Sequence, residues 1–355
     1  MTDIAPDPIL EIRSLAVHFG GRRGRPPVRA VDGVDLNVNR RETVGLIGES
    51  GSGKSTLGRA ALGLVKPTAG RVLIGGEPVW ERRRRRQRDA RGRVQVIFQD
   101  PSEALDPRMT VAAAIREPLR IRDGRHRPEH DEIVEQLLVQ VGLDPAHGSR
   151  RPHELSGGQK QRVNIARGLV LDPDLVVCDE VVSALDVSVQ AEILNLFARL
   201  KRERELAYLF ITHDLGVVTH VADRVAVMYL GKLMEVGRAT EVILRPRHPY
   251  TRALIAAQPQ ALPSSLRKPT PPPLVGDIPS PAAPPSGCRF RTRCQFSRDS
   301  CARDEPALRE LAPGHLVACH FAEELASIEA VGDTDTSSPT ATRSDRSAYI
   351  HTGES

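Results

Sequence analysis

The stretch LIGESGSGKST at residues 46–56 decides the fold. It fits the phosphate-loop pattern G-x4-G-K-S/T, in which glycines let backbone N–H groups surround an anion and the following helix adds its positive end. Residues 43–47 predict a strand that enters the loop. Lys54 is expected to reach the terminal phosphates of a nucleotide, and the Ser55 hydroxyl to complete a Mg²⁺ site. We expect nucleotide contacts along the whole loop: Gly48, Glu49, Ser50, Gly51, Ser52, Gly53, Lys54, Ser55 and Thr56.

The composition is that of a soluble globular protein of about two domains. Of the 355 residues, 40% are hydrophobic and 27% are charged, and the formal net charge is +5. No apolar run approaches the ~18 residues of a membrane span, and the N-terminus lacks the blocks of a secretory signal. The run from Glu81 to Arg88 holds six arginines without interleaved aromatic residues, which favours a solvated surface over a nucleic-acid site. We therefore expect a cytoplasmic protein without a nucleic-acid partner.

Alternating strand and helix patterns predict an α/β fold with a parallel sheet. Helical spacing appears from about 110 to 141, after residue 159, and from 189 to 200. The chain becomes proline-rich after residue 260, and residues 331–355 are rich in Ser, Thr and Asp, which predicts disorder there. Apolar runs and alternation predict strands at 9–19, 34–38, 43–47, 71–74, 94–98, 175–178 and 206–211.

Polar residues follow three of these predicted strands, at the sheet edge where open α/β folds bind ligands. Asp179 is expected to hold Mg²⁺, and Glu180 to polarise a water for attack on a γ-phosphate. His213 is expected to orient that water and base, and the amide oxygen of Gln99 to face Mg²⁺ or water. The expected catalytic residues are therefore Lys54, Gln99, Glu180 and His213. The expected Mg²⁺ ligands are Ser55, Gln99 and Asp179.

The sequence LSGGQ at residues 155–159 predicts a second anion-binding site, again at a helix N-terminus. One chain does not need two γ-phosphate sites so far apart in sequence. A head-to-tail dimer does need them, because each phosphate loop would then face the other subunit's LSGGQ. We therefore expect ATP to lie between two subunits, with contacts from Ser156, Gly157, Gly158 and Gln159.

Six motifs in a fixed order resemble the ATP-binding subunit of an ABC transporter: GESGSGKST, Gln99, LSGGQ, LVVCDE at 175–180, SALD at 183–186 and His213. The resemblance covers roughly residues 9–240. It implies a P-loop NTPase fold, with a RecA-like parallel sheet core, an antiparallel β subdomain and an α-helical signature subdomain at about 100–170. It also implies that Phe19 stacks on adenine, that Asp186 links the two sites of the dimer, and that residues 99–109 receive the coupling helices of the membrane subunits.

A narrower set of motifs is similar to the oligopeptide/dipeptide importer branch, which also handles nickel and some glycosides: AVDGVDL at 30–36, HPYTRAL at 248–254, GDIPSP at 276–281, GCRFRTRC at 287–294 and GHLVACH at 314–320. The resemblance implies an ATPase that powers peptide uptake from the cytoplasmic face of the cell membrane. KSTLGRA at 54–60 implies a heterodimer with a second ATPase, on two transmembrane permease subunits fed by an extracytoplasmic solute-binding protein. The expected domains are 1–260 for nucleotide binding, 261–325 for a C-terminal domain with four cysteines, and 326–355 for a disordered tail.

The sequence departs from the family pattern at two places. Val181 stands where most members have proline, and Glu103, Ala104 and Asp106 replace small polar residues and an asparagine. Neither change touches an expected phosphate ligand, so we expect hydrolysis to survive.

Four of the five cysteines lie near the C-terminus, in the spacing C-x5-C-x6-C-x17-C: Cys288, Cys294, Cys301 and Cys319. This spacing lacks the paired C-x2-C of most structural zinc sites, although four thiolates could ligate zinc or an iron–sulfur cluster. The alternative is four reduced thiols in a small packed domain. The resemblance to the peptide branch implies a structural four-iron four-sulfur cluster. Cys178 lies within an apolar strand and is expected to be a core residue.

Other functions fit the sequence less well. A soluble ABC ATPase that acts on nucleic acid would typically carry a coiled-coil insertion, a zinc hook or two cassettes, whereas this chain has one cassette and no heptad run. A nucleotide kinase would leave LSGGQ unexplained. Import of nickel or glycosides is the alternative within the same family.

Overall fold

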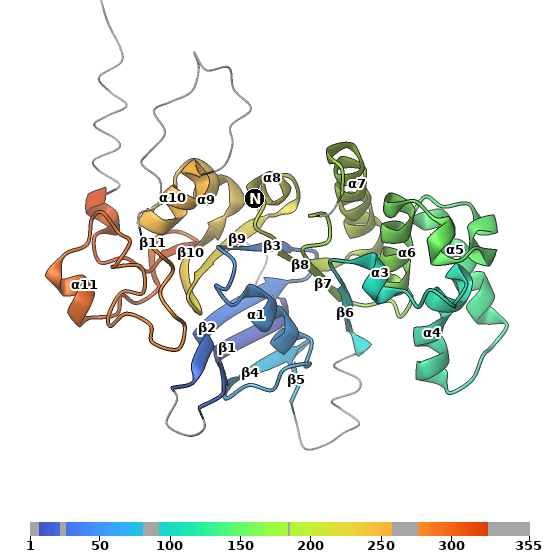
Figure 1. Cartoon of the computed structure of the whole chain (residues 1–355), viewed down its shortest axis with the longest axis horizontal. Helices are drawn as coiled ribbons and strands as arrows, with labels where there is room; N and C mark the ends of the chain where they lie inside the picture. The colour runs from blue at the N-terminus through green and yellow to red at the C-terminus, as the bar shows by residue number, and fades with distance from the viewer. Residues whose placement is uncertain (1–6, 22–25, 81–91, 184, 258–275, 326–355) are drawn as a thin grey trace, which may run out of the picture.

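An eight-stranded mixed sheet runs through the centre of the molecule (Figure 1). The structure is a computed structural model and describes residues 7–21, 26–80, 92–183, 185–257 and 276–325. The run β6-β7-β8-β3-β9 is parallel, and β10, β12 and β11 continue the sheet antiparallel. In spatial order the strands are β11 (Arg309–Ala312), β12 (His315–Val317), β10 (Lys232–Arg238), β9 (Arg224–Tyr229), β3 (Thr43–Ile47), β8 (Ala207–Ile211), β7 (Leu175–Asp179) and β6 (Val94–Ile97).

The central strands are apolar on both faces, as expected of a parallel sheet covered on both sides. Every residue of β3 and β8 is buried. On one face, Phe197 stacks edge-on against Tyr208 and Phe210, with ring centroids 5.5 and 5.2 Å apart. The predicted α/β class with a parallel core is confirmed, and Cys178 is a buried core residue as expected.

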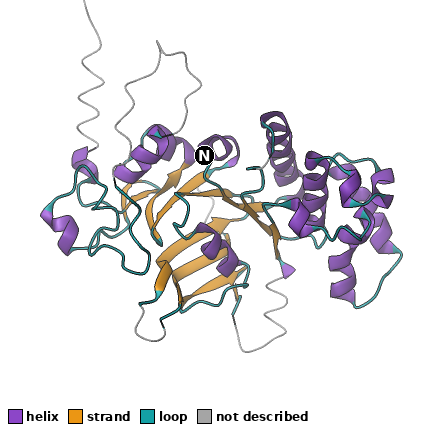
Figure 2. Ribbon diagram, viewed as in Figure 1, coloured by secondary structure: helices purple, strands orange, loops and turns teal. Residues whose placement is uncertain are grey.

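A second sheet of four antiparallel strands lies beside the first, below it in Figures 1 and 2. Its order is β2-β1-β4-β5, and α1 (Lys54–Ala61) contacts strands of both sheets. This sheet matches the expected antiparallel β subdomain. Its strands are β2 (Val28–Asn39), β1 (Pro8–Phe19), β4 (Ala69–Ile74) and β5 (Glu77–Pro78).

A group of helices extends from the edge of the main sheet at β6, on the right of Figure 1. The region 110–141, expected to be helical, forms two helices because Gly124 takes a left-handed φ of 73° and ends the first. The group contains α3 (Pro101–Ala104), α4 (Val111–Asp123), α5 (Glu129–Gln140), η1 (Pro145–Ser149), η2 (Pro152–Glu154) and α6 (Gly157–Leu169).

The C-terminal part of the chain adds two strands to the main sheet. Strand β12 pairs with β10, with Glu235 opposite Val317, and β11 pairs with β12. The expected boundaries at 260/261 and 325/326 lie in or beside residues outside the described ranges and stay predictions. The remaining helices are α7 (Val187–Arg204), α8 (Leu215–Val221), α9 (Ala239–Leu244), α10 (Pro249–Ala256) and α11 (Asp299–Arg303).

Three expectations fall wholly or partly on residues that the structure does not describe: the arginine run within 81–91, the proline-rich stretch at 263–285 as far as residue 275, and the disordered tail at 326–355. Within the described ranges, no helix combines the length and apolar character needed to span a bilayer.

Candidate nucleotide site

The phosphate loop leaves the carboxyl end of β3 and enters α1, as predicted. The two glycines that the pattern G-x4-G-K-S/T fixes, Gly48 and Gly53, are required by close packing. Gly48 has a φ of 151°, and a Cβ there would lie 2.1 Å from the Met228 carbonyl oxygen. Gly53 has a φ of 106°, and a Cβ there would lie 2.0 Å from the Ala30 carbonyl oxygen. The loop therefore passes so close to neighbouring backbone that no side chain fits at either position.

Lys54 folds back over this loop. Its Nζ donates to the carbonyl oxygens of Gly48 and Glu49, at 2.7 and 3.0 Å. Burial lowers the pKa of the Lys54 ammonium, and the nearby carboxylates of Glu180, Asp179 and Glu49 act in the opposite direction. The loop's own carbonyls thus fix a cation beside the backbone amides that would face a phosphate.

The other loop residues differ in exposure. Ser50 and Gly51 form the exposed tip, and Thr56 is half-buried. Ser52 is buried, its carbonyl oxygen accepts from the Gly231 backbone N–H at 2.9 Å, and its hydroxyl has no hydrogen-bond partner among the described residues.

Ser55 and Asp179 join the loop to the end of β7. The Ser55 hydroxyl donates to the Asp179 carboxylate at 3.1 Å. Burial raises the pKa of Asp179, and the bond from Ser55 opposes that rise. Hydroxyl and carboxylate oxygens are ligands that Mg²⁺ prefers, so this pair fits the predicted metal site.

Glu180 follows directly and has a left-handed φ of 51°, an uncommon conformation for glutamate that is often found at functional sites. Its backbone N–H donates to the Ile211 carbonyl oxygen at 2.9 Å, which fixes the residue between β7 and β8. Its Oε1 lies 3.3 Å from Nδ1 of His213. The predicted base and the predicted histidine are therefore neighbours.

Gln99 is linked to Glu180 through a residue that sequence reasoning did not single out. The Gln99 amide donates to the Ser183 hydroxyl at 3.3 Å, and that hydroxyl donates to the Glu180 carbonyl oxygen at 2.9 Å. The only sequence indication of this role was that Ser183 opens the SALD motif. The expected contact of Gln99 with Mg²⁺ stays a prediction.

The LSGGQ motif lies at the start of α6, in the helical group. Ser156 caps this helix: its hydroxyl accepts from the Gln159 N–H at 3.3 Å, and the Gln159 side chain accepts from the Ser156 N–H at 3.0 Å. A Cβ at Gly157 would meet nothing within 4 Å. The helix N-terminus is thus ordered, partly exposed and open at Gly157, while Gly158 packs against Val189.

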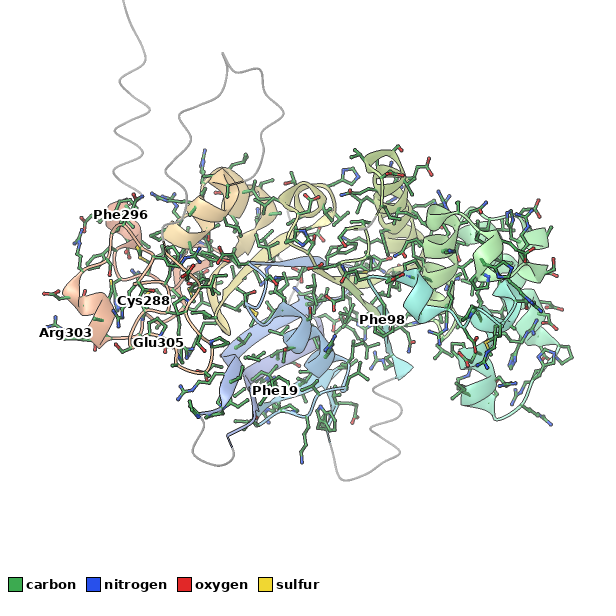
Figure 3. All side chains as sticks on the ribbon, viewed as in Figure 1. Phe19, Phe98, Cys288, Phe296, Arg303 and Glu305 are labelled. Carbon is green, nitrogen blue, oxygen red and sulfur yellow. The ribbon has the colours of Figure 1, made fainter. Side chains whose placement is uncertain are left out.

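Phe19 and Asp186 lie apart from these contacts. Phe19 ends β1 on the antiparallel sheet and is 45% exposed (Figure 3). Asp186 precedes α7, where its carbonyl oxygen accepts from the Gln190 N–H at 2.8 Å and its side chain makes no capping bond. Their expected roles at adenine and across a dimer stay predictions.

Two distant residues hold Glu49, and sequence reasoning assigned neither. The Glu49 N–H donates to the Tyr250 hydroxyl at 2.8 Å, and its carboxylate is bound by Arg293. Tyr250 belongs to the motif HPYTRAL and Arg293 to the motif GCRFRTRC. The sequence therefore showed both motifs but did not indicate that they contact the phosphate loop.

The prediction of a four-iron four-sulfur cluster is wrong. Within the described ranges, no group of three or more His, Cys, Asp or Glu side chains is placed to hold a metal ion. The thiols are free, and burial raises the pKa of Cys288 to about 12 and of Cys294 to about 11, which favours the protonated form. The four cysteines line a cavity with only ≈ 20 Å³ of accessible space, about enough for one water. The segment therefore has the alternative form considered above, reduced thiols packed among aromatic rings.

Comparisons with known proteins identify this arrangement. Residues 31–183 match the ABC transporter family, and residues 234–301 match the oligopeptide/dipeptide transporter C-terminal region. The chain is 45% identical to the oligopeptide transport ATP-binding protein AppF of Bacillus subtilis, over 90% of this chain and 99% of that protein. The chain belongs to the ATP-binding proteins of ABC transporters, in the oligopeptide/dipeptide family. It is also 47% identical to a putative peptide import ATP-binding protein of Brucella ovis, over 88% and 97% of the two chains.

Solved structures agree with the assignment. CbiO1 of Clostridium perfringens, part of an ABC transporter complex, has a TM-score of 0.60 at 29% identity and covers 67% of this chain and 92% of its own. A dimeric ATP-binding cassette in a post-hydrolysis state with ADP and Pi has a TM-score of 0.58 at 27% identity, over 65% and 98%. The expected P-loop NTPase fold and the expected ABC-type ATPase are confirmed.

Proposed function

We propose that this chain is the ATP-hydrolysing subunit of an importer that takes up oligopeptides or dipeptides, and that it works at the cytoplasmic face of the cell membrane. One observation carries the ATPase part: Ser55 and Asp179 meet at 3.1 Å, beside the pair formed by Glu180 and His213. The peptide part is supported by the C-terminal match and by relatives named for peptide transport along nearly their whole length.

The residues of the chain divide the work. Lys54 and the loop amides bind the phosphates of ATP. Ser55 and Asp179 would hold Mg²⁺, which would neutralise phosphate charge when bound. Glu180 accepts a proton from the attacking water, and His213 keeps the Glu180 carboxylate oriented. Gln99 reaches Glu180 through Ser183, so a movement of Gln99 would alter the position of the base.

We further propose that the site is completed by a second cassette. LSGGQ presents an exposed helix N-terminus that carries a partial positive charge, and Ser156 and Gln159 cap this end with two reciprocal bonds. Such an end is suited to the γ-phosphate of ATP held by another subunit. The dimeric state of the solved cassette with ADP and Pi supports this arrangement. The partners we propose are a sister ATPase, two permease subunits and an extracytoplasmic binding protein.

The proposal is tested by reconstitution. Proteoliposomes with the two permeases, the sister ATPase and this chain are given binding protein, labelled peptide and ATP. We expect peptide to accumulate only with ATP and only with the wild-type chain, whereas the Lys54→Ala chain leaves the vesicles empty. Parallel vesicles receive Ni²⁺ or a glycoside instead. Peptide accumulation that is absent, or equal with the Lys54→Ala chain, would contradict the proposal, and transport of Ni²⁺ alone would reassign the solute.

A further inference from the structure

Two buried arginines from one C-terminal segment bind residues in and beside the nucleotide site: Arg293 binds Glu49 of the phosphate loop, and Arg289 binds Asp32 of β2. The arginine segment (residues 287–294) lies between the sheet and α11, and Cys288 marks it in Figure 3. Its Arg289 and Arg293 side chains are only 5% and 6% exposed. Buried arginines are rare unless paired, so their partners show what the segment does.

Arg293 binds the phosphate loop directly. Its Nη1 donates to Oε2 of Glu49 at 2.6 Å, and its Nη2 to Oε1 at 3.1 Å. This is the two-bond geometry in which a guanidinium fixes both position and orientation of a carboxylate. Because the Glu49 N–H also donates to Tyr250, both the side chain and the backbone of this loop residue are held by the C-terminal part of the chain.

The orientation of Glu49 matters for the binding of phosphate. The Glu49 carbonyl oxygen is one of the two acceptors that hold Lys54 over the loop. A contact chain thus runs from Arg293 through Glu49 to Lys54. In addition, a carboxylate in the loop would repel the phosphates of ATP, and the guanidinium of Arg293 offsets that charge.

Arg289 makes the parallel contact on the other side. It pairs with Asp32 of β2, whose Oδ1 lies 3.1 Å from Nε2 of His18, the residue before Phe19. Its Nη1 also donates to the Leu230 carbonyl oxygen at 3.4 Å, next to the Gly231 N–H that binds the Ser52 carbonyl. One segment therefore contacts the surroundings of both the expected adenine end and the phosphate end.

We propose that Arg293 is a positioning residue for ATP: it orients and neutralises Glu49, and so makes the C-terminal segment part of the nucleotide site. The inference rests on the proposed function, because it requires the loop to bind ATP. In this proposal the arginine segment acts on the phosphate loop through the Arg293 side chain, and its cysteine thiols take no part in the chemistry.

The test is a double-mutant cycle read out as the Kd of a fluorescent ATP analogue, on the full-length chain with Mg²⁺. We expect Arg293→Ala to weaken binding about tenfold, because it leaves an unpaired carboxylate in the loop. The variant Glu49→Gln/Arg293→Ala should return to within about threefold of wild type. Arg291→Ala is the matched control, because the Arg291 guanidinium donates to Ser286 and not to the phosphate loop, and this variant should bind as wild type does. Arg293→Gln replaces Arg293→Ala if the alanine variant does not fold.

The outcomes separate cleanly. If the arginine variant binds as wild type does, or if the double variant stays as weak as the single one, Arg293 only packs the segment and the inference is overturned. If the folded wild-type chain itself does not bind the analogue, the proposed function has failed, and the cycle shows no difference between variants. A restored double variant with a normal Arg291→Ala control supports the inference.

Discussion

Glu180 sits in a left-handed conformation with one carboxylate oxygen facing His213, and these two facts set its expected chemistry. Replacing it by glutamine keeps the shape and removes the proton acceptor. We predict that Glu180→Gln lowers the rate of ATP hydrolysis by about 10²-fold or more while the Kd for ATP changes little. Single-turnover phosphate release and nucleotide binding measure the two effects. Glu203→Gln, on α7, serves as a control, and unchanged hydrolysis in Glu180→Gln would remove Glu180 as the base.

Lys54 is the second residue whose role can be isolated. Its ammonium is held by two loop carbonyls, so its loss removes a fixed positive charge from the phosphate site. We predict that Lys54→Ala lowers kcat/KM for ATP by about 10²-fold or more. The exposed Lys66 provides a matched lysine, and Lys66→Ala should behave as wild type. Near-normal turnover in Lys54→Ala would show that ATP binds elsewhere.

At the scale of elements, sequence patterns located the strands that lead to the expected catalytic residues and three strands of the antiparallel sheet, but not β9, β10, β11 and β12. Loop residues 46–56 and the carboxylates after residues 175–178 identified β3 and β7 because each strand ends in a group with a definite chemical use. Strands β9 and β12 were not predicted, although each pairs with a strand nearby in sequence, β10 and β11 respectively; only their other partners, β3 and β10, lie far away along the chain. Arg293 was likewise visible only as part of a motif, because its contact with Glu49 spans 244 positions.

The N-terminus of α10 gives a testable link between burial and pH. His248 is fully buried, and its Nδ1 accepts from the Tyr250 N–H. Burial lowers the pKa of His248 from 6.5 to about 4. Between pH 6.5 and pH 4, His248 is protonated in the unfolded chain but stays neutral in the folded chain. The contribution to folding stability is therefore complete above pH 6.5 and falls as the pH drops toward 4, by about 3 kcal/mol in total.

The corresponding prediction concerns His248→Asn, which keeps a side-chain acceptor at the helix start and removes the titration. Between pH 7 and pH 5, we expect this variant to lose about 2 kcal/mol less stability than wild type does. Urea unfolding at both pH values measures the difference. The exposed His153 offers the control His153→Asn, which should keep the wild-type pH slope. An identical slope in His248→Asn would mean that His248 does not govern the acid sensitivity.

At the scale of the whole molecule, alternating strand and helix patterns predicted the parallel core correctly, whereas the antiparallel subdomain and the helical group were expected only from the resemblance to ABC transporter subunits. The sequence did not predict that the C-terminal part would add β12 to the same sheet beside β10. Local patterns describe single elements and carry no information on which distant strand completes an edge. The cysteine prediction failed for a related reason: spacing alone does not reveal that the thiols would face a cavity barely large enough for a water.

LSGGQ and the phosphate loop of one chain lie in different parts of the fold, and this separation is the reason to expect a two-chain assembly. Ser156 caps α6 in the helical group, whereas the loop leaves the centre of the sheet (Figure 1). Our account holds that two chains bring these parts together. A chain that cannot bind ATP should then still activate a partner, provided that its own Ser156 is intact.

The most direct measurement is the ATPase rate of the complex between this chain and its sister ATPase, per mole of sister ATPase, as the complex is diluted until its subunits are monomeric. We predict that the rate falls toward zero on dilution and returns when excess Lys54→Ala chain is added, because that chain supplies LSGGQ to the sister subunit's phosphate loop without hydrolysing ATP itself. Added Lys54→Ala/Ser156→Arg chain should restore nothing. A rate per mole that stays constant through dilution, whichever chain is added, would contradict the shared site.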